Sequence, residues 1–200
     1  MALPATDAFT DDNGTPLPDH NANWTEVVGS FVINTNQVYC DGMSATPNFC
    51  AGAGWNGDAF NDDQYSEATV STMDADLPMI GLIVRCDVDT PAATYYMWDS
   101  NPGASFIEKV VAGARTTLNP GPGEQLTPWA EGDRIRFEIE GADMRFYIND
   151  VLTDTWNDAT IASGAPGIGS LLTGAAHMLD NWEGGNLFAP FPRSFAVMIG

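Results

Sequence analysis

The stretch AEGDRIRFEIEGADMRFYINDVLTDTW, residues 130–156, decides the fold class of this chain. Apolar and charged residues alternate in its first half, which places Ile135, Phe137 and Ile139 on one side of an extended segment. A two-residue period is typical of a β-strand with one buried face. The opposite side carries the charged residues Arg134, Arg136, Glu138 and Glu140.

The same alternation resumes after the turn EGAD, with Met144, Phe146 and Ile148 on one side. Asn149-Asp150 then predicts a two-residue hairpin turn, because Asn and Asp tolerate positive φ better than most residues. The returning segment begins at Val151. We therefore predict a three-stranded antiparallel meander with one apolar face, and such a face needs a second sheet to cover it.

Short β-rich runs recur between turn signals along the rest of the chain, and helix-period patterns are nearly absent. This pattern predicts an all-β, two-sheet antiparallel β-sandwich formed by one domain, residues 1–186. The predicted strands are Val27–Ile33, Gln37–Tyr39, Glu67–Thr72, Ile80–Cys86, Thr94–Trp98, Phe106–Val111, Arg134–Glu140, Met144–Asn149, Val151–Trp156, Gly167–Leu171 and His177–Trp182. The Gly-rich stretch CAGAGWNGDAFNDD, residues 50–63, is expected to be a loop.

The last segment, LFAPFPRSFAVMIG at 187–200, is apolar, interrupted by proline and outside the alternation. We predict that it is a docking tail for assembly, and the alternative is that it packs back on the sandwich. The residues expected to make the assembly contacts are Phe188, Phe191, Phe195, Val197 and Met198.

The chain is strongly acidic, with 27 acidic residues against 7 basic ones and a net charge of -20. Such a surface repels phosphate, so nucleic acid and anionic membranes are not expected partners. No window approaches the ~18 apolar residues of a membrane span. The first residues have neither a basic nor an apolar signal region, so we expect synthesis in the cytoplasm without a signal peptide.

Three cysteines occur, Cys40, Cys50 and Cys86, without a C-x-x-C motif. An odd number with this spacing argues against a zinc site and against a full disulfide framework. A bridge between Cys40 and Cys50 is possible from the spacing, but three reduced thiols are the favoured interpretation. Cys86 lies in an apolar run and is expected in the core.

The run GDRIRFEIEGADMRFYINDVL with DATIASGAPGIGS resembles the C-terminal half of the concanavalin A-like lectin and glucanase jelly rolls, in their laminin-G-like branch. Gly132-Asp133, Gly141, Tyr147–Asn149 and Gly164–Gly169 stand where that branch has its recurring turns and strand ends. Asp150 departs from the usual glycine. The resemblance extends over most of residues 5–186, and it implies a jelly roll more strongly than any activity.

Some relatives in this superfamily are glucanases, whose hydrolysis needs two carboxylates facing one sugar bond. Their Glu-x-Asp-x-x-Glu pattern is absent, since Glu131-Gly132-Asp133 is followed by Arg134. Only two histidines occur, His20 and His177, which excludes His-rich metal chemistry and gives a Ser-His-Asp triad little support. We therefore expect a protein that is not an enzyme.

Two kinds of binding site remain candidates. The resemblance implies a structural calcium ion at Asp7 and Asp180; the alternative is that Asp7 caps a turn and Asp180 is a surface residue. The stretches NDD at 61–63 and DVD at 87–89 are weaker calcium candidates and are expected to form turns. The glycan-binding candidates are Trp55, expected to be exposed in the Gly-rich loop, and Asp62, Arg85 and Tyr95, expected to face one groove. The alternative for the aromatic residues is core packing, which we expect for Trp98, Trp156 and Trp182.

The preferred function is that of a non-catalytic structural or adhesive protein of a particle, for which a bacteriophage virion fits best as a capsid decoration, fibre or spike component. Its expected partners are other particle proteins, further copies of the chain and surface polysaccharide. One alternative is a free, lectin-like carbohydrate-binding module, located outside the cell. A glycoside hydrolase or lyase is a further alternative.

Overall fold

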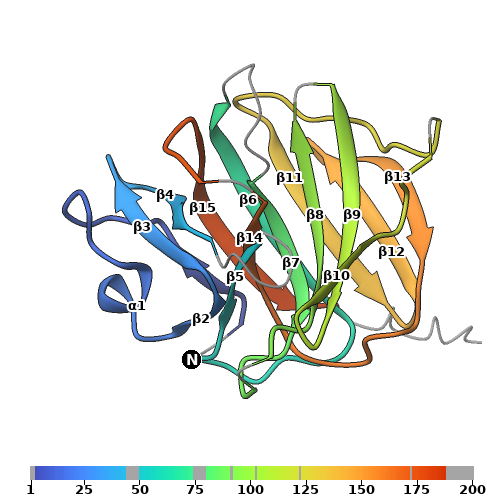
Figure 1. Cartoon of the computed structure of the whole chain (residues 1–200), viewed down its shortest axis with the longest axis horizontal. Coiled ribbons are helices and arrows are strands. Elements are labelled where there is room, and N and C mark those ends of the chain that lie inside the picture. The colour runs from blue at the N-terminus through green and yellow to red at the C-terminus, as the bar shows by residue number, and fades with distance from the viewer. Residues whose placement is uncertain are drawn as a thin grey trace, which may run out of the picture.

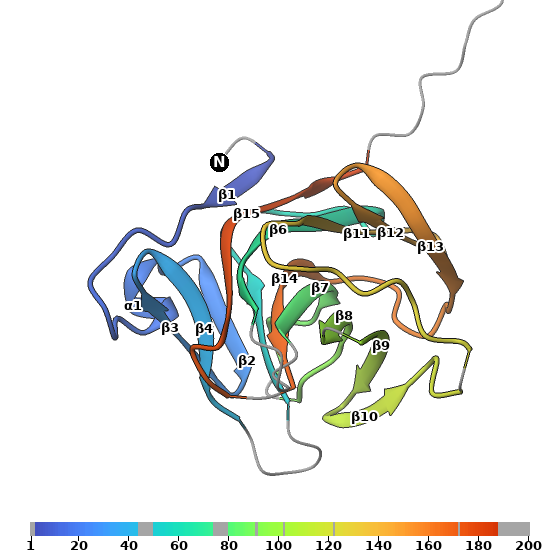
Figure 2. The ribbon, with the colours of Figure 1, turned by 90° about the horizontal axis from the view of Figure 1, so that it is seen from above.

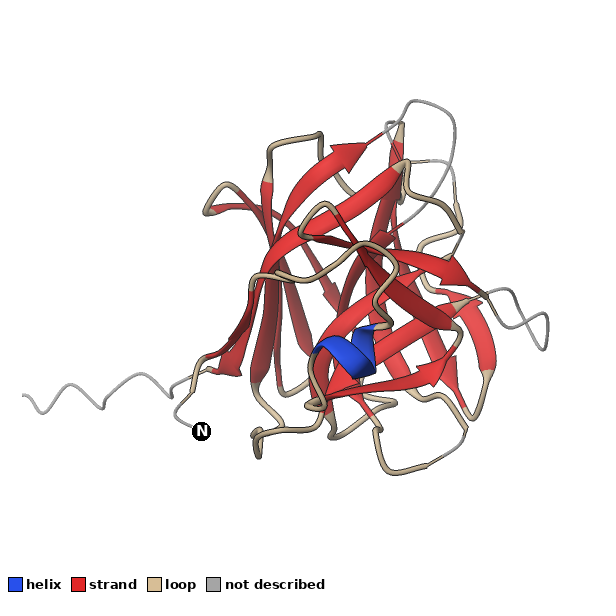
Figure 3. Ribbon diagram, turned by 90° about the vertical axis from the view of Figure 1, so that its left-hand side faces the viewer, coloured by secondary structure: helices blue, strands red, loops and turns tan. Residues whose placement is uncertain are grey.

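The structure is a computed structural model that describes residues 3–43, 50–73, 80–90, 92–101, 103–121, 123–171 and 173–187. Within these residues nearly every regular element is a β-strand, and the exception is the short helix α1 (Leu17–His20) (Figure 3). No helix in these ranges is long and apolar enough to span a membrane.

Two antiparallel sheets face each other (Figures 1 and 2). The eight strands of the first sheet, in spatial order with β1 attached to β15, are β13 (Val151–Asn157), β12 (Asp143–Ile148), β11 (Arg134–Glu140), β6 (Gln64–Met73), β15 (His177–Asn186), β4 (Gln37–Gly42), β3 (Ser30–Asn34) and β1 (Ala5–Asp7). The seven strands of the second sheet are β10 (Ala114–Thr117), β9 (Ala104–Val111), β8 (Tyr95–Asn101), β7 (Ile80–Cys86), β14 (Ala165–Ser170), β5 (Ala51–Trp55) and β2 (Trp24–Val28). The predicted two-sheet antiparallel sandwich is therefore confirmed.

The main core lies between the sheets and takes side chains from both. Phe137 and Phe146 of the first sheet stack with ring centroids 4.9 Å apart, and Trp98 of the second sheet lies 5.1 Å from Phe146. Such aromatic pairs contribute about 0.5–1.5 kcal/mol each beyond their burial. Trp98 and Trp182 are buried as predicted, and Trp156 is partly buried at the edge of the core.

The opening meander is confirmed as β11, β12 and β13. Ile135, Phe137 and Ile139 are fully buried on its inner face. Asn149 and Asp150 have φ values of 52° and 66°, as a two-residue hairpin turn between Ile148 and Val151 requires.

The outer face of this meander is an ion-pair network. Arg136 contacts Glu138 on its own strand and Glu67 on β6, while Arg145 on β12 contacts Glu138 and Glu140. The Arg136 guanidinium also lies 3.6 Å from the centre of the Tyr65 ring. Arg134 pairs with Glu67 and Asp150, so the network extends from β11 to β6 and to the hairpin turn.

The sequence prediction was wrong for several strands outside the meander. The predicted strand Val27–Ile33 is two strands, β2 and β3, because Gly29 adopts a φ of 71° between them and the chain changes sheet there. The Gly-rich stretch contains the buried strand β5 instead of being all loop. The short strands β1 and β10 were not predicted.

Candidate functional site

A cavity lies at one end of the sandwich, where four connections between strands meet. Its volume is about 650 Å³, in the range of small-molecule sites. Its lining comes from the connections β5–β6, β7–β8 and β13–β14 and from the β9–β10 end. The residues are Trp55, Asn56, Asp58, Phe60, Cys86, Asp87, Val88, Asp89, Thr94, Val111, Thr160, Ile161, Ala162, Ser163, Gly164 and Ala165. We call this cavity the end pocket.

One wall of the end pocket, residues 160–165, is held from behind by Arg85 of β7. The Arg85 side chain is 3 % exposed, and its Nη1 donates a hydrogen bond of 2.7 Å to the carbonyl oxygen of Ile161. Its Nη2 donates to the carbonyl of Gly141 at 2.7 Å and its Nε to the carbonyl of Asp62 at 3.0 Å. The five donors of a planar guanidinium suit such a three-way contact, so Arg85 ties three loops together.

Lys109 and Tyr96 fix Asp158, which lies two residues before the same wall. Lys109 Nζ donates to Asp158 Oδ2 at 2.8 Å and to the hydroxyl of Thr160 at 2.9 Å. The Tyr96 hydroxyl donates to Asp158 Oδ1 at 2.5 Å and accepts the backbone N–H of Ile161 at 2.9 Å. Burial acts to raise the pKa of Asp158, but these hydrogen bonds outweigh it and hold that pKa well below its usual range. The wall is thus held in place by hydrogen bonds from other parts of the protein.

The chemistry of the end pocket is that of hydrogen-bond acceptors. Asp58, Asp87 and Asp89 line it, together with hydroxyl groups and backbone, and none of its lining residues is basic. Asp87 is oriented by the backbone N–H of Asp89 at 3.1 Å and the hydroxyl of Thr90 at 2.8 Å. The indole Nε1 of Trp55 donates to Asp58 Oδ2 at 3.0 Å, which lowers the pKa of Asp58. Apolar contact surface comes from Phe60, Val88 and Val111.

The expectation that Trp55 is exposed is wrong, because β5 carries it into the core. It is 1 % exposed and stacks on Trp182 with ring centroids 5.3 Å apart, while Trp24 meets it edge-on at 5.2 Å. Trp55 lines the end pocket but is almost fully buried, so its ring is not an exposed surface on which a sugar can stack.

The predicted groove of Asp62, Arg85 and Tyr95 is not formed. Arg85 uses its donors on backbone carbonyls, and Tyr95 is fully buried on the outer side of the second sheet. Asp62 is exposed and lines a separate hollow with Phe60, Asn61, Asp63 and Leu187. Arg85 and Tyr95 lie on neighbouring strands, as predicted, but their side chains do not share a groove. Arg85 has a positive φ of 53° where the β7–β14 register shifts, and this interrupts the regular alternation of side chains along β7.

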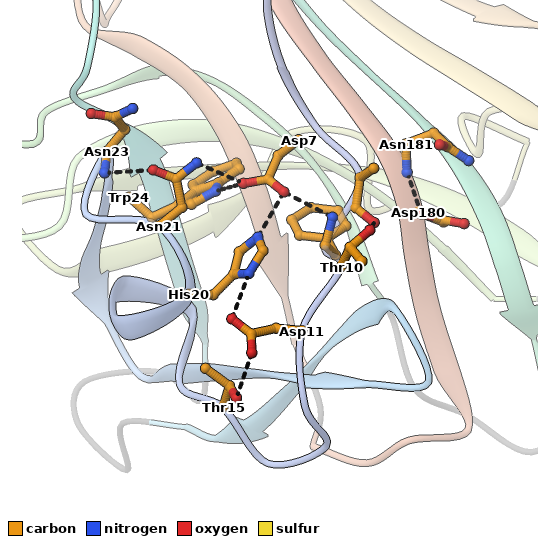
Figure 4. A network of polar contacts seen from close by, with 12 residues as sticks. Asp7, Thr10, Asp11, Thr15, His20, Asn21, Asn23, Trp24, Asp180 and Asn181 are labelled. Atoms are coloured by element: carbon orange, nitrogen blue, oxygen red, sulfur yellow. Dashed lines mark hydrogen bonds and ion pairs between the residues drawn. The ribbon is translucent and has the colours of Figure 1, made fainter.

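Asp7, a predicted calcium ligand, is instead surrounded by protein donors (Figure 4). Its Oδ1 accepts the backbone N–H of Phe9 at 2.8 Å and contacts His20 Nε2 at 2.9 Å. Its Oδ2 accepts Asn21 Nδ2 at 3.1 Å and Trp24 Nε1 at 2.9 Å. The N–H groups that point at this carboxylate take the place of a cation, so this donor set does not fit calcium.

Asp180 lies apart from this network and accepts the backbone N–H of Asn181 (Figure 4). Among the residues that the structure describes, no three His, Cys, Asp or Glu side chains are grouped to hold a metal ion. The calcium hypothesis for Asp7 and Asp180 is therefore corrected: Asp7 fastens β1 to α1 and β2. The three cysteines are free and buried, in line with the favoured interpretation.

His20 links Asp7 to Asp11, whose Oδ2 lies 3.1 Å from His20 Nδ1. Burial lowers the pKa of His20, but the two carboxylates outweigh burial and raise that pKa above its ordinary value of 6.5.

We therefore predict a pH-dependent contribution from His20. A raised pKa in the folded state means that the stabilisation is complete below pH 6.5 and is lost as the pH rises through the folded pKa. The free energy of unfolding, measured with urea from pH 5 to pH 9, should differ most between wild type and His20→Gln at the acidic end. A difference that stays constant over this range would rule out a charged His20 in the native state.

The predicted assembly residues, Phe188, Phe191, Phe195, Val197 and Met198, lie outside the described residues, so their role stays a prediction. The strand β15 ends at Asn186, next to the predicted start of the tail. Most of the end pocket was missed by sequence reasoning. Its residues lie in DVDTPA and DATIASG, which carry only turn signals until the fold brings them together.

No family model matches the sequence, and no curated protein matches it. Solved structures do match in shape. A carbohydrate-binding module, CBM66 from Bacillus subtilis, aligns over 82 % of this chain and 92 % of its own, with a TM-score of 0.55 and 18 % identity. The laminarinase from Rhodothermus marinus aligns over 91 % and 97 %, with a TM-score of 0.52 and 11 % identity.

A third structure, the exoplasmic/lumenal domain of VIP36 in a Ca²⁺/Man3GlcNAc-bound form, aligns over 86 % of both chains with a TM-score of 0.53 and 10 % identity. At these identities the likeness concerns the fold and not the chemistry. The sheet order, the meander and these neighbours agree with the family resemblance of the sequence, and the chain has the concanavalin A-like jelly-roll fold.

Proposed function

We propose that this chain is a non-catalytic carbohydrate-binding domain that takes a sugar in the end pocket. The observation that carries the proposal is the wall at residues 160–165, which hydrogen bonds from Arg85, Lys109 and Tyr96 hold in place. A site that is already ordered loses less conformational entropy on binding, and affinity rises accordingly.

The lining matches the chemistry of a sugar. Sugar hydroxyl groups are donors, and Asp87 and Asp89 offer charged acceptors, whose hydrogen bonds are stronger than those of neutral groups. The C–H faces of a sugar ring can pack on Phe60, Val88 and Val111. Since no basic residue lines the pocket, uncharged and amino sugars are favoured over uronic or sulfated ones.

The structural neighbours support this class of function by analogy of fold. One is described as a carbohydrate-binding module and another carries a bound oligosaccharide. Glucanases share the fold as well, but their acidic motif is absent from this sequence. Glu138 and Glu140, which the sequence pattern places on one face of β11, are engaged by arginines, which supports a binding role over hydrolysis.

The proposed setting is a particle surface, with a bacteriophage virion as the first candidate. The feature of the sequence that supports it is the apolar segment 187–200. In this setting the segment attaches the domain to particle proteins or to further copies, and the end pocket faces outward.

A glycan array probed with the labelled full chain tests the binding function. Neutral or amino-sugar glycans should bind, and Asp87→Asn/Asp89→Asn should weaken the best of them by about 10- to 100-fold, because each lost charged hydrogen bond contributes about 1.5–3 kcal/mol before compensation by water.

The matched control is Asp12→Asn/Asp19→Asn, which removes the same two charges from exposed positions away from the pocket. It should bind like wild type. Equal weakening by both double variants would show that net charge and not the end pocket governs binding.

A further inference from the structure

The second sheet carries a group of buried polar atoms that the end pocket does not use. In the described part of the chain, three buried side-chain oxygens have no hydrogen-bond partner: the hydroxyl of Tyr95 and both carboxylate oxygens of Asp99. Both residues belong to β8, where even spacing places them on the same face, turned away from the main core. Unsatisfied buried oxygens are rare in native proteins and call for an explanation such as an ion.

Asp99 has a second acid beside it on the neighbouring strand. In the β8–β9 register Asp99 lies opposite Phe106 and Met97 lies opposite Glu108, so Glu108 is the diagonal neighbour of Asp99 on the same face. Asp99 is 0 % exposed and Glu108 is 3 % exposed. On the other side the register partner of Asp99 is Gly81, which adds no side chain next to the carboxylate.

The two acids differ in what surrounds them. The hydroxyl of Thr117 on β10 lies 2.8 Å and 3.0 Å from the two oxygens of Glu108, and it can donate to them. Asp99 accepts no hydrogen bond, and the positive charge of Arg115 acts on both acids. Burial and the charge of Glu108 both raise the pKa of Asp99, and burial raises the pKa of Glu108.

We propose that Asp99 and Glu108 bind a divalent cation on the outer face of the second sheet. Buried carboxylates in proteins are paired with cations or coordinate metals, because an uncompensated buried charge is costly. Hard cations such as Ca²⁺ and Mg²⁺ take oxygen ligands of this kind. Asp99 differs in this respect from Asp7. Four N–H groups contact the carboxylate of Asp7, whereas the carboxylate oxygens of Asp99 accept no hydrogen bond.

This cation has a structural role and is independent of sugar binding. The described residues provide two carboxylates and no third His, Cys, Asp or Glu in the group, so the remaining ligands are hydroxyl or carbonyl oxygens or water. Since both acids are buried, the ion is taken up as the chain folds, and its binding free energy adds to the stability of the fold.

The test is thermal unfolding of the full chain after treatment with a chelator, followed by separate additions of Ca²⁺, Mg²⁺ and Mn²⁺ at fixed ionic strength. We expect at least one of these ions to raise the Tm of the wild type by about 2–8 °C when present well above its Kd. Asp99→Asn and Glu108→Gln should lose this response, and the control Asp12→Asn/Asp19→Asn should keep it.

A wild-type Tm that none of the three ions changes would overturn the proposal and leave a shared proton as the compensation for the pair. An unchanged response in Asp99→Asn would overturn it as well. If the variants do not fold, terbium luminescence of the wild type, excited through tryptophan and displaced by Ca²⁺ at about one equivalent, decides the same question. Absence of displaceable luminescence counts against the site.

Discussion

Replacement of Arg85 by methionine is expected to lower the free energy of unfolding by about 3–5 kcal/mol, the largest effect among the variants considered. Methionine retains much of the length of the side chain but leaves the carbonyls of Asp62, Gly141 and Ile161 without their donors. The bond to Ile161 is buried and the bonds to Asp62 and Gly141 are part-buried, and an unsatisfied buried acceptor costs about 1–3 kcal/mol. Urea unfolding at pH 7 measures the loss.

Arg85→Lys is the informative control, because an ammonium group keeps the charge but cannot reach three carbonyls as a planar fork does. It should recover less than half of the loss. The same two variants should weaken glycan binding, since Arg85 holds the wall of the end pocket. A loss below about 1 kcal/mol in Arg85→Met would show that the loops are held by other contacts.

Replacement of Asp7 by alanine is expected to cost about 2–4 kcal/mol. The change leaves four donors without their acceptor, including the buried indole N–H of Trp24 and an imidazole that Asp7 helps to keep charged. Asp7 is only 7 % exposed, so water does not readily replace it. The difference in the free energy of unfolding is best measured with urea at pH 6, below the raised pKa of His20.

Asp7→Asn serves as its near-isosteric control and should have an intermediate effect, because one acceptor oxygen remains while the amide nitrogen faces other donors. Asp12→Ala, at an exposed carboxylate five residues away, should change the stability by less than about 0.5 kcal/mol. Addition of Ca²⁺ should not rescue Asp7→Asn. A Ca²⁺-dependent difference between wild type and Asp7→Asn would restore the calcium hypothesis at this position.

The meander could be predicted from the sequence because its physics is local. Alternation fixes which face of β11 is buried, and the turn residues Asn149 and Asp150 fix the hairpin register. Strand β5 could not be predicted in the same way. Gly52 and Gly54 carry no side chain because Tyr95 and Val88 occupy the adjacent space, so the strand lacks the apolar alternation that signals a strand.

The candidate site was predictable only in part. Trp55 lines the end pocket, but its predicted exposure was wrong, since the strand that buries it has no sequence signature. Arg85 was singled out as a ligand contact, and its function in the fold is to position a loop. The residues that line the end pocket are mostly turn formers of ordinary type, and the strand order β9-β8-β7-β14-β5 of the second sheet brings their loops together.

The central claim is that a sugar occupies the end pocket, and one matched pair of variants tests it most directly. Ala162 is an exposed residue of the pocket wall, and Ala130 is an exposed residue in the loop before β11, outside the pocket lining. Isothermal titration of the strongest array glycan should show binding to wild type and to Ala130→Trp, and none to Ala162→Trp, whose indole fills the pocket. Equal affinity of Ala162→Trp and wild type would place the sugar elsewhere on the molecule and contradict the account.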